Sequence, residues 1–173
     1  MKGSMHLIGG VSVGIATAYL LTKDVTSTAV CGMIGGIGGL FPDIDSPTSM
    51  ISKNIPLVPK AINKAFGHRT FTHSLMIPIF IGGIAYLCRN NKNAFLGLIC
   101  FGIGFLMHLI QDTLTKGGVP WLYPLKRKRF SLLPIRSGNP IEIVFTIILI
   151  GIYVGGLSYV LTGSFVPKDL GML

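Results

Sequence analysis

The sequence predicts an all-α fold, a polytopic membrane helical bundle of about five membrane helices plus a short interfacial helix. Hydrophobic residues fill 50% of the 173 positions, and only 12% are charged, about half the share found in soluble domains. The apolar residues form five runs, and many of the 23 glycines lie inside them. This length allows one domain, so residues 1–173 are expected to form a single unit.

The five runs differ in how well their lengths suit a bilayer. They are His6–Thr22, Val25–Phe41, Ser74–Cys88, Ala94–Gln111 and Ile143 to about Thr162. Crossing the hydrocarbon core takes about 20 apolar residues in a helix. The fifth run meets this length, and the first, second and fourth come close to it. The third is short and would need a thinned bilayer or flanking residues that snorkel. A partly embedded bundle is the alternative.

Two local patterns complete the expected fold. Between the second and third runs, residues 57–66 place Lys60 and Lys64 on one helical face, which predicts the short interfacial helix. The second run contains glycines four residues apart, a spacing typical of close helix contacts in membranes. A phosphate-binding loop is excluded there, because Leu40-Phe41-Pro42 follows the last glycine in place of a lysine and a hydroxyl residue.

The basic residues predict an orientation. If all five runs cross, one side of the membrane holds eleven of the fifteen basic residues: Lys2, Lys53, Lys60, Lys64, Arg69, Lys116, Lys126, Arg127, Lys128, Arg129 and Arg136. The positive-inside rule places this side, with the N-terminus, in the cytoplasm of a multi-pass plasma (inner) membrane protein. The net charge of +9 then reflects topology and contact with membrane lipids, and no nucleic-acid partner is expected.

The same side collects the residues that can bind metals. All four histidines and four of the six acids lie there: His6, His68, His73, His108, Asp43, Asp45, Asp112 and Glu142. Each has an ordinary alternative, since His6 could be an interfacial anchor, the two aspartates of Pro42-Asp43-Ile44-Asp45 could form a turn, and His108 could simply hydrogen bond Asp112. In an extended stretch Asp43 and Asp45 point the same way. His108 and Asp112 share one helical face.

Taken together, these residues predict a metal site. Ionisable groups at a membrane edge are costly to keep there, so their gathering on one side favours a function. Four imidazoles and three aspartates suit zinc best, with manganese or iron as alternatives. Seven ligands exceed the needs of one catalytic ion. We therefore expect two or three divalent ions bound by His6, Asp43, Asp45, His68, His73, His108 and Asp112.

Three motifs in this order resemble the YdjM-like family, described as membrane-bound, predicted metal-dependent hydrolases. They are Pro42-Asp43-Ile44-Asp45-Ser46-Pro47, Gly67-His68-Arg69-Thr70-Phe71-Thr72-His73-Ser74, and His108-Leu109-Ile110-Gln111-Asp112 with Gly117-Gly118-Val119-Pro120-Trp121 after it. Gly138-Asn139-Pro140-Ile141-Glu142 is similar to the family's last motif. A more distant likeness is to zinc-dependent phospholipase C, which combines an early histidine, Pro-Asp, paired histidines and a His-x-x-x-Asp motif around metals.

The resemblance implies hydrolysis by metal-activated water at the cytoplasmic membrane face. The expected substrate is a phosphoester of a lipid or of a lipid-linked molecule. Arg69 would hold an anionic oxygen, and Glu142 would act as a general base or as a partner of a ligating histidine. Lys126–Arg129 would face lipid headgroups or only set topology. A metal or ion transporter and a non-catalytic metal-binding scaffold or regulator are the alternatives, and the sequence leaves the oligomeric state open.

Overall fold

The computed structural model describes residues 1–47, 49, 52, 70–133 and 135–162. It contains five α-helices: α1 (Gly3–Thr22), α2 (Val25–Leu40), α4 (Met76–Leu87), α5 (Lys92–Thr113) and α6 (Ile141–Thr162). Two short 3₁₀ helices, η1 (Phe41–Asp45) and η3 (Phe71–His73), follow α2 and precede α4. Within these residues β structure is limited to isolated backbone bridges. The all-α prediction is therefore confirmed. The interfacial helix expected at 57–66 lies outside the described residues.

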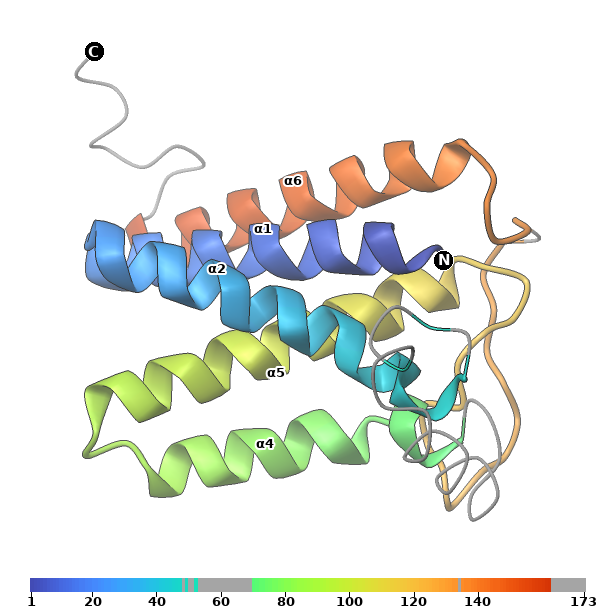
Figure 1. Cartoon of the computed structure of the whole chain (residues 1–173), viewed down its shortest axis with the longest axis horizontal. Helices are drawn as coiled ribbons and strands as arrows, with labels where there is room; N and C mark the ends of the chain where they lie inside the picture. Colours follow the sequence, from blue (N-terminus) through green and yellow to red (C-terminus); the bar gives the residue numbers. More distant parts are fainter. Residues whose placement is uncertain (48, 50–51, 53–69, 134, 163–173) are drawn as a thin grey trace.

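The helices run side by side with α5 in the middle of the bundle (Figure 1). α5 packs against α1, α2 and α4, whereas α6 packs mainly along α1. One end of the bundle holds the start of α1, the end of α2, the start of α4, the end of α5 and the start of α6. The opposite end holds the α1–α2 and α4–α5 turns. Segments far apart in the sequence therefore meet at one end.

Short polar segments set both turns at the opposite end. The Asp24 carboxylate accepts a hydrogen bond of 2.6 Å from the Ser27 N–H and so caps α2. The same hydrogen bond lowers the pKa of Asp24. Lys23 takes the left-handed conformation, with φ of 55°, that ends α1. Asn91 caps α5 by accepting from the Ala94 N–H at 3.1 Å. These caps separate the helices where the apolar runs break.

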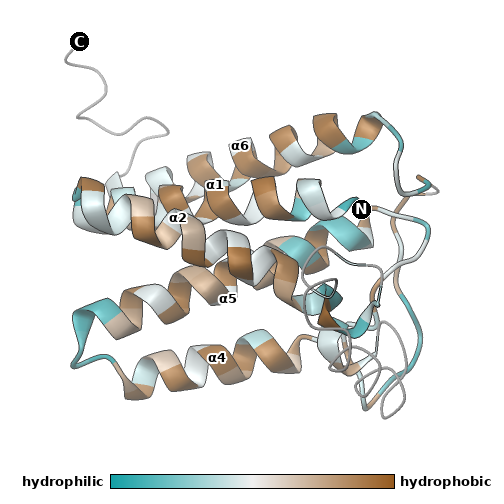
Figure 2. Cartoon of the chain, in the orientation of Figure 1, coloured by the Kyte–Doolittle hydropathy of each residue, from teal (hydrophilic) through white to brown (hydrophobic). Residues whose placement is uncertain are grey.

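Among the residues that the structure describes, four helices are long and apolar enough to cross a membrane: α1, α2 with its extension to Asp45, α5, and α6 up to Tyr159. Apolar residues cover the bodies of the helices, and hydrophilic residues gather at the ends (Figure 2). The third expected span, α4, has only 12 residues, about 18 Å of helix. α4 is thus shorter than the hydrocarbon core, as the short third run suggested.

Glycines bring α1, α2 and α5 into backbone contact. A methyl group on Gly35 of α2 would overlap the carbonyl oxygen of Gly10 on α1, and one on Gly104 of α5 would overlap that of Gly35. Small residues are needed wherever membrane helices approach this closely. By contrast, no described atom outside the nearby backbone of α6 lies within 4 Å of the position that a Cβ of Gly151 would take. The close helix packing that the glycine spacing of the second run predicted is therefore present in the structure.

The substitution Gly35→Ala is expected to destabilise the bundle by about 1–3 kcal/mol or more, because the new methyl group forces the backbones of α1 and α2 apart. The matched control Gly151→Ala is expected to be neutral or to gain up to about 1 kcal/mol from helix propensity. Thermal unfolding of the purified protein in mild detergent measures both. Equal stability of the two variants would contradict the packing role of Gly35.

Candidate metal centre

Five of the seven predicted ligands meet at the end of the bundle where the helix ends gather. α1 supplies His6, η1 supplies Asp43, η3 supplies His73, and α5 supplies His108 and Asp112. The α-helical repeat places His108 and Asp112 on the same face of α5, as their spacing predicted. Pro42 lies in the first turn of η1 and helps to turn the chain after α2. The site therefore depends on four separate segments.

The distances between donor atoms resemble those of a coordination sphere. The Nε2 atoms of His73 and His108 lie 3.3 Å apart, and Asp43 Oδ1 lies 3.7 and 3.9 Å from them. Asp112 Oδ2 lies 3.9 and 4.0 Å from the same two nitrogens. Tetrahedral zinc with bonds of about 2.0–2.2 Å separates its donor atoms by about 3.3–3.6 Å. These four side chains are thus arranged closely enough to share an ion.

His6 extends the site into a second group. Its donor atom lies within 4.8 Å of those of Asp43 and His108, while His73, His108 and Asp112 form the other group. His6 Nε2 is also 3.3 Å from Asp112 Oδ1. The imidazoles of His6 and His108 stack, with ring centroids 3.7 Å apart and planes at 20°. Because the two groups share His108, the donor set can serve adjacent ions.

Hydrogen bonds to Nδ1 hold all three imidazoles in the same tautomer. His108 Nδ1–H donates to the Gly39 carbonyl at 2.7 Å, and His6 Nδ1–H donates to Gln111 Oε1 at 2.9 Å. The Thr72 hydroxyl donates to Asp45 Oδ2 at 2.7 Å, so it can accept from His73 Nδ1–H at 3.1 Å. Each Nδ1 therefore holds a proton, and each Nε2 is left with a lone pair. Partners of this kind fix metal-binding histidines.

The burial of these donor atoms is compatible with a bound cation. His6, His73, His108 and Asp112 are fully buried, and the Asp43 side chain is 16% exposed. His6 Nε2 makes no hydrogen bond to the described residues. The positively charged α-amino group of Met1 contacts the Asp112 carboxylate. A buried carboxylate needs positive charge or hydrogen-bond donors around it. The donor set and its burial therefore fit a divalent metal ion.

Two predicted site residues lie beside the centre. Asp45 is on the Nδ1 side of His73, 3.8 Å away, where its carboxylate holds Thr72. The Glu142 carboxylate accepts the backbone N–H groups of Lys2, at 3.1 Å, and Gly138, at 2.9 Å. In the described part of the chain, Glu142 thus binds backbone and contacts no histidine. His68 and Arg69 lie outside the described residues.

Gln111 and Thr72 hydrogen bond His6 and His73, and neither was predicted from the sequence. Gln111 is fully buried, and its amide group also donates to the Met5 carbonyl at 3.0 Å and to Thr146 Oγ1 at 3.1 Å. The sequence does contain one indication of a role for Gln111, because this polar residue immediately precedes Asp112 in a strongly apolar helix. A polar residue buried there needs partners.

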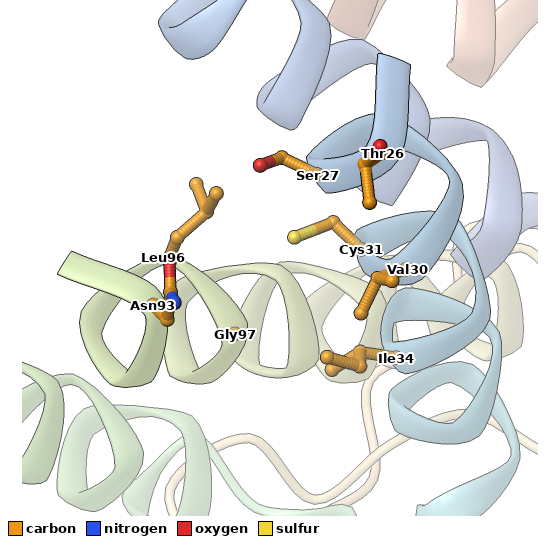
Figure 3. Close-up of a pocket in the computed structure, with 8 residues that line it drawn as sticks. All are labelled: Thr26, Ser27, Val30, Cys31, Ile34, Asn93, Leu96 and Gly97. Atoms are coloured by element: carbon orange, nitrogen blue, oxygen red, sulfur yellow. The ribbon is translucent and has the colours of Figure 1, made fainter. Parts of the chain in front are cut away.

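The pocket in Figure 3 is separate from the metal centre. It has a volume of about 230 Å³ and lies between the first turns of α2 and of α5, at the opposite end of the bundle. Its lining is formed mainly by small and apolar side chains such as Val30, Ile34 and Leu96. It therefore contributes no group to the metal centre.

Comparison with known proteins shows the family to which the chain belongs. The family model described as YdjM inner membrane protein matches residues 1–166. An uncharacterised protein of Bacillus subtilis, YvsG, is 36% identical over 124 residues, 72% of this chain and 74% of its own length. The inner membrane protein YdjM of Escherichia coli is 37% identical over 109 residues, 60% of this chain and 54% of its own length. No solved structure matches. The chain therefore belongs to the YdjM inner membrane protein family.

Proposed function

We propose that this membrane protein is a metal-dependent hydrolase that cleaves a phosphoester of a lipid or lipid-linked substrate. The observation that carries the proposal is the convergence of three imidazole Nε2 atoms and two aspartates in a buried site at one end of a membrane bundle. Zinc suits these donors best, and manganese and iron also accept them. The two overlapping donor groups support two ions, and we propose His68, which lies outside the described residues, as a ligand of a third.

Each residue has a distinct part in this proposal. His6, Asp43, His73, His108 and Asp112 hold the metal, while Gln111, Thr72 and the Gly39 carbonyl keep the imidazoles in place. A bound divalent ion supplies hydroxide near neutral pH by lowering the pKa of its water to about 7. Asp43 marks the side where water and substrate reach the site, because it is the partly exposed ligand. Arg69 would bind the phosphoryl oxygens.

The membrane setting supports a lipid substrate. His108 and Asp112 lie in the last turns of a helix that can span the bilayer, close to its end. A site at this level faces the zone where lipid phosphates lie. The excess of basic residues in the sequence supports a cytoplasmic location for this end. The Glu142 carboxylate stabilises the same end by binding the backbone at the starts of α1 and α6.

Two other functions compete with hydrolysis. Transport sites lie near the membrane midplane, whereas these ligands lie at one end of the bundle (Figure 1), which argues against a metal or ion transporter. A non-catalytic scaffold or regulator would use the ion only for structure, and the full burial of four ligands suits that role. The exposed edge of Asp43 favours a site open to water.

The purified protein is expected to contain zinc or another divalent metal, and His73→Ala and Asp112→Ala are expected to lose most of it. Each substitution removes a donor atom from the group formed with His108. Asp24→Ala at the opposite end of the bundle is the matched control and should keep the metal of the wild type. Elemental analysis after extraction in detergent gives the content. Negligible metal in the wild type would contradict the site.

Thr72→Val and Gln111→Leu are expected to weaken metal binding by about 10–100-fold, because His73 and His6 lose the groups that hold their Nδ1 protons. Thr72→Ser keeps the hydroxyl and should bind as the wild type does. Titration of the metal-free protein against a competing chelator measures the affinity. Unchanged affinity in both disruptive variants would show that these hydrogen bonds do not orient the ligands.

The protein in vesicles is expected to hydrolyse a member of a phosphoester panel that includes phospholipids and lipid-linked phosphates. Chelation, His108→Ala and Asp112→Ala should each abolish turnover, whereas Asp24→Ala should retain it. Release of phosphate or of the phosphorylated headgroup is the readout. A metal-loaded protein inactive on the whole panel would favour the scaffold, and metal uptake into the vesicles would favour the transporter.

A further inference from the structure

The segment between α5 and α6 carries a surface that the metal centre does not use. Four consecutive basic residues, Lys126 to Arg129, are exposed there. Large apolar side chains beside them are also exposed: Leu122 by 50%, Leu125 by 88%, Phe130 by 53% and Leu132 by 59%. We call these eight residues the basic–apolar loop. Cations interleaved with exposed apolar side chains are typical of surfaces that bind at a membrane interface.

The base of this loop is firmly held. Val119 and Phe130 exchange two backbone hydrogen bonds of 2.9 Å. The Trp121 indole N–H donates to Thr113 Oγ1 at 2.9 Å, and the Trp121 carbonyl accepts the Leu75 N–H at 3.0 Å. These contacts connect the loop to the end of α5 and to the segment before α4. The exposed leucines are thus presented by an anchored scaffold.

The position of the loop suits the boundary between membrane and water. The segment leaves α5 at the metal-centre end and passes beside the start of α4 at the edge of the bundle (Figure 1). Thr113, to which Trp121 is bonded, is the last residue of a candidate span. At this level the leucines can enter the acyl boundary while the cations reach lipid phosphates. If this loop faced only water, its exposed leucines would have no apolar surroundings, which is unfavourable for a patch of this kind.

We propose that the basic–apolar loop binds anionic phospholipids, with Leu122 and Leu125 inserted and Lys126–Arg129 on the headgroups. Charge complementarity selects the occupant, because four adjacent cations match the negative phosphates of such lipids. Trp121 lies between the chain segments that carry His73 and Asp112, so the lipids would gather beside the metal centre. This inference does not rest on hydrolysis.

The single tryptophan of the chain provides a direct probe, because Trp121 is part of the loop's base. The full chain is placed in phosphatidylcholine vesicles doped with a small fraction of brominated phosphatidylglycerol or brominated phosphatidylcholine. We expect the local concentration of brominated phosphatidylglycerol around Trp121 to be about fivefold that of brominated phosphatidylcholine. This is the enrichment that the attraction of one cation for an anionic headgroup would produce. The enrichment should fall as the ionic strength rises.

Variants assign the effect to the loop. Replacing Lys126, Arg127, Lys128 and Arg129 with glutamine should abolish the enrichment while leaving quenching by the brominated phosphatidylcholine intact. Lys126→Arg with Lys128→Arg should retain it, and Leu125→Asp should reduce quenching by both lipids. The control Arg89→Gln with Lys92→Gln alters the opposite end of the bundle and should change nothing.

The outcomes that overturn the proposal are distinct. They are equal quenching by the two lipids in the wild type, enrichment that survives in the four-glutamine variant, and enrichment lost in the control. Displacement of the anionic lipid by a soluble RNA or an acidic peptide at equal charge would assign the surface to another partner. Asp112→Ala should keep the enrichment, so a failure of the hydrolase proposal leaves this test unaffected.

Discussion

The structure depends on the burial of two carboxylates among imidazole lone pairs at one end of a membrane bundle. Asp43 and Asp112 face the Nε2 atoms of His73 and His108 at 3.7–4.0 Å, with little or no exposure to water. Such a cluster repels itself in a medium of low dielectric constant unless positive charge lies within it. A divalent ion held by these four side chains would connect three separate segments, η1, η3 and α5. Metal binding is therefore expected to stabilise the packing of these segments at this end.

Close helix contact makes this arrangement available. Because Gly10, Gly14, Gly35 and Gly104 carry no side chains at the contacts of α1, α2 and α5, the three backbones approach directly. The ends of these helices then lie near enough for His6, Asp43 and His108 to meet. α6 is attached differently, because it packs mainly along α1 and reaches the site through the hydrogen bond that the Gln111 amide donates to Thr146 Oγ1.

Much of the fold, and the gathering of the histidines and aspartates at one end of the bundle, could be predicted from the sequence. Apolar runs between charged breaks gave the helices, and the i, i+4 spacing placed His108 beside Asp112. The roles of individual residues were harder, because they depend on contacts between distant segments. Asp45 and Asp43 appear equivalent in sequence, yet Thr72, from another segment, draws Asp45 to the far side of His73. Glu142 is used by backbone groups at Lys2 and Gly138, a contact that no local pattern encodes.

The three imidazoles differ in how easily a substitution elsewhere in the chain can remove the hydrogen bond that orients them. His6 and His73 are oriented by side chains, so a single substitution at Gln111 or Thr72 removes the support. His108 is oriented by the backbone carbonyl of Gly39, which every amino acid possesses. Substitution of Gly39 would still disturb His108. Any side chain there would collide with the His6 carbonyl oxygen and shift the Gly39 carbonyl oxygen that accepts from His108. Gly39 thus serves both helix packing and the tautomer of His108. A substitution at this position would disrupt both, so selection is expected to act against it on two grounds.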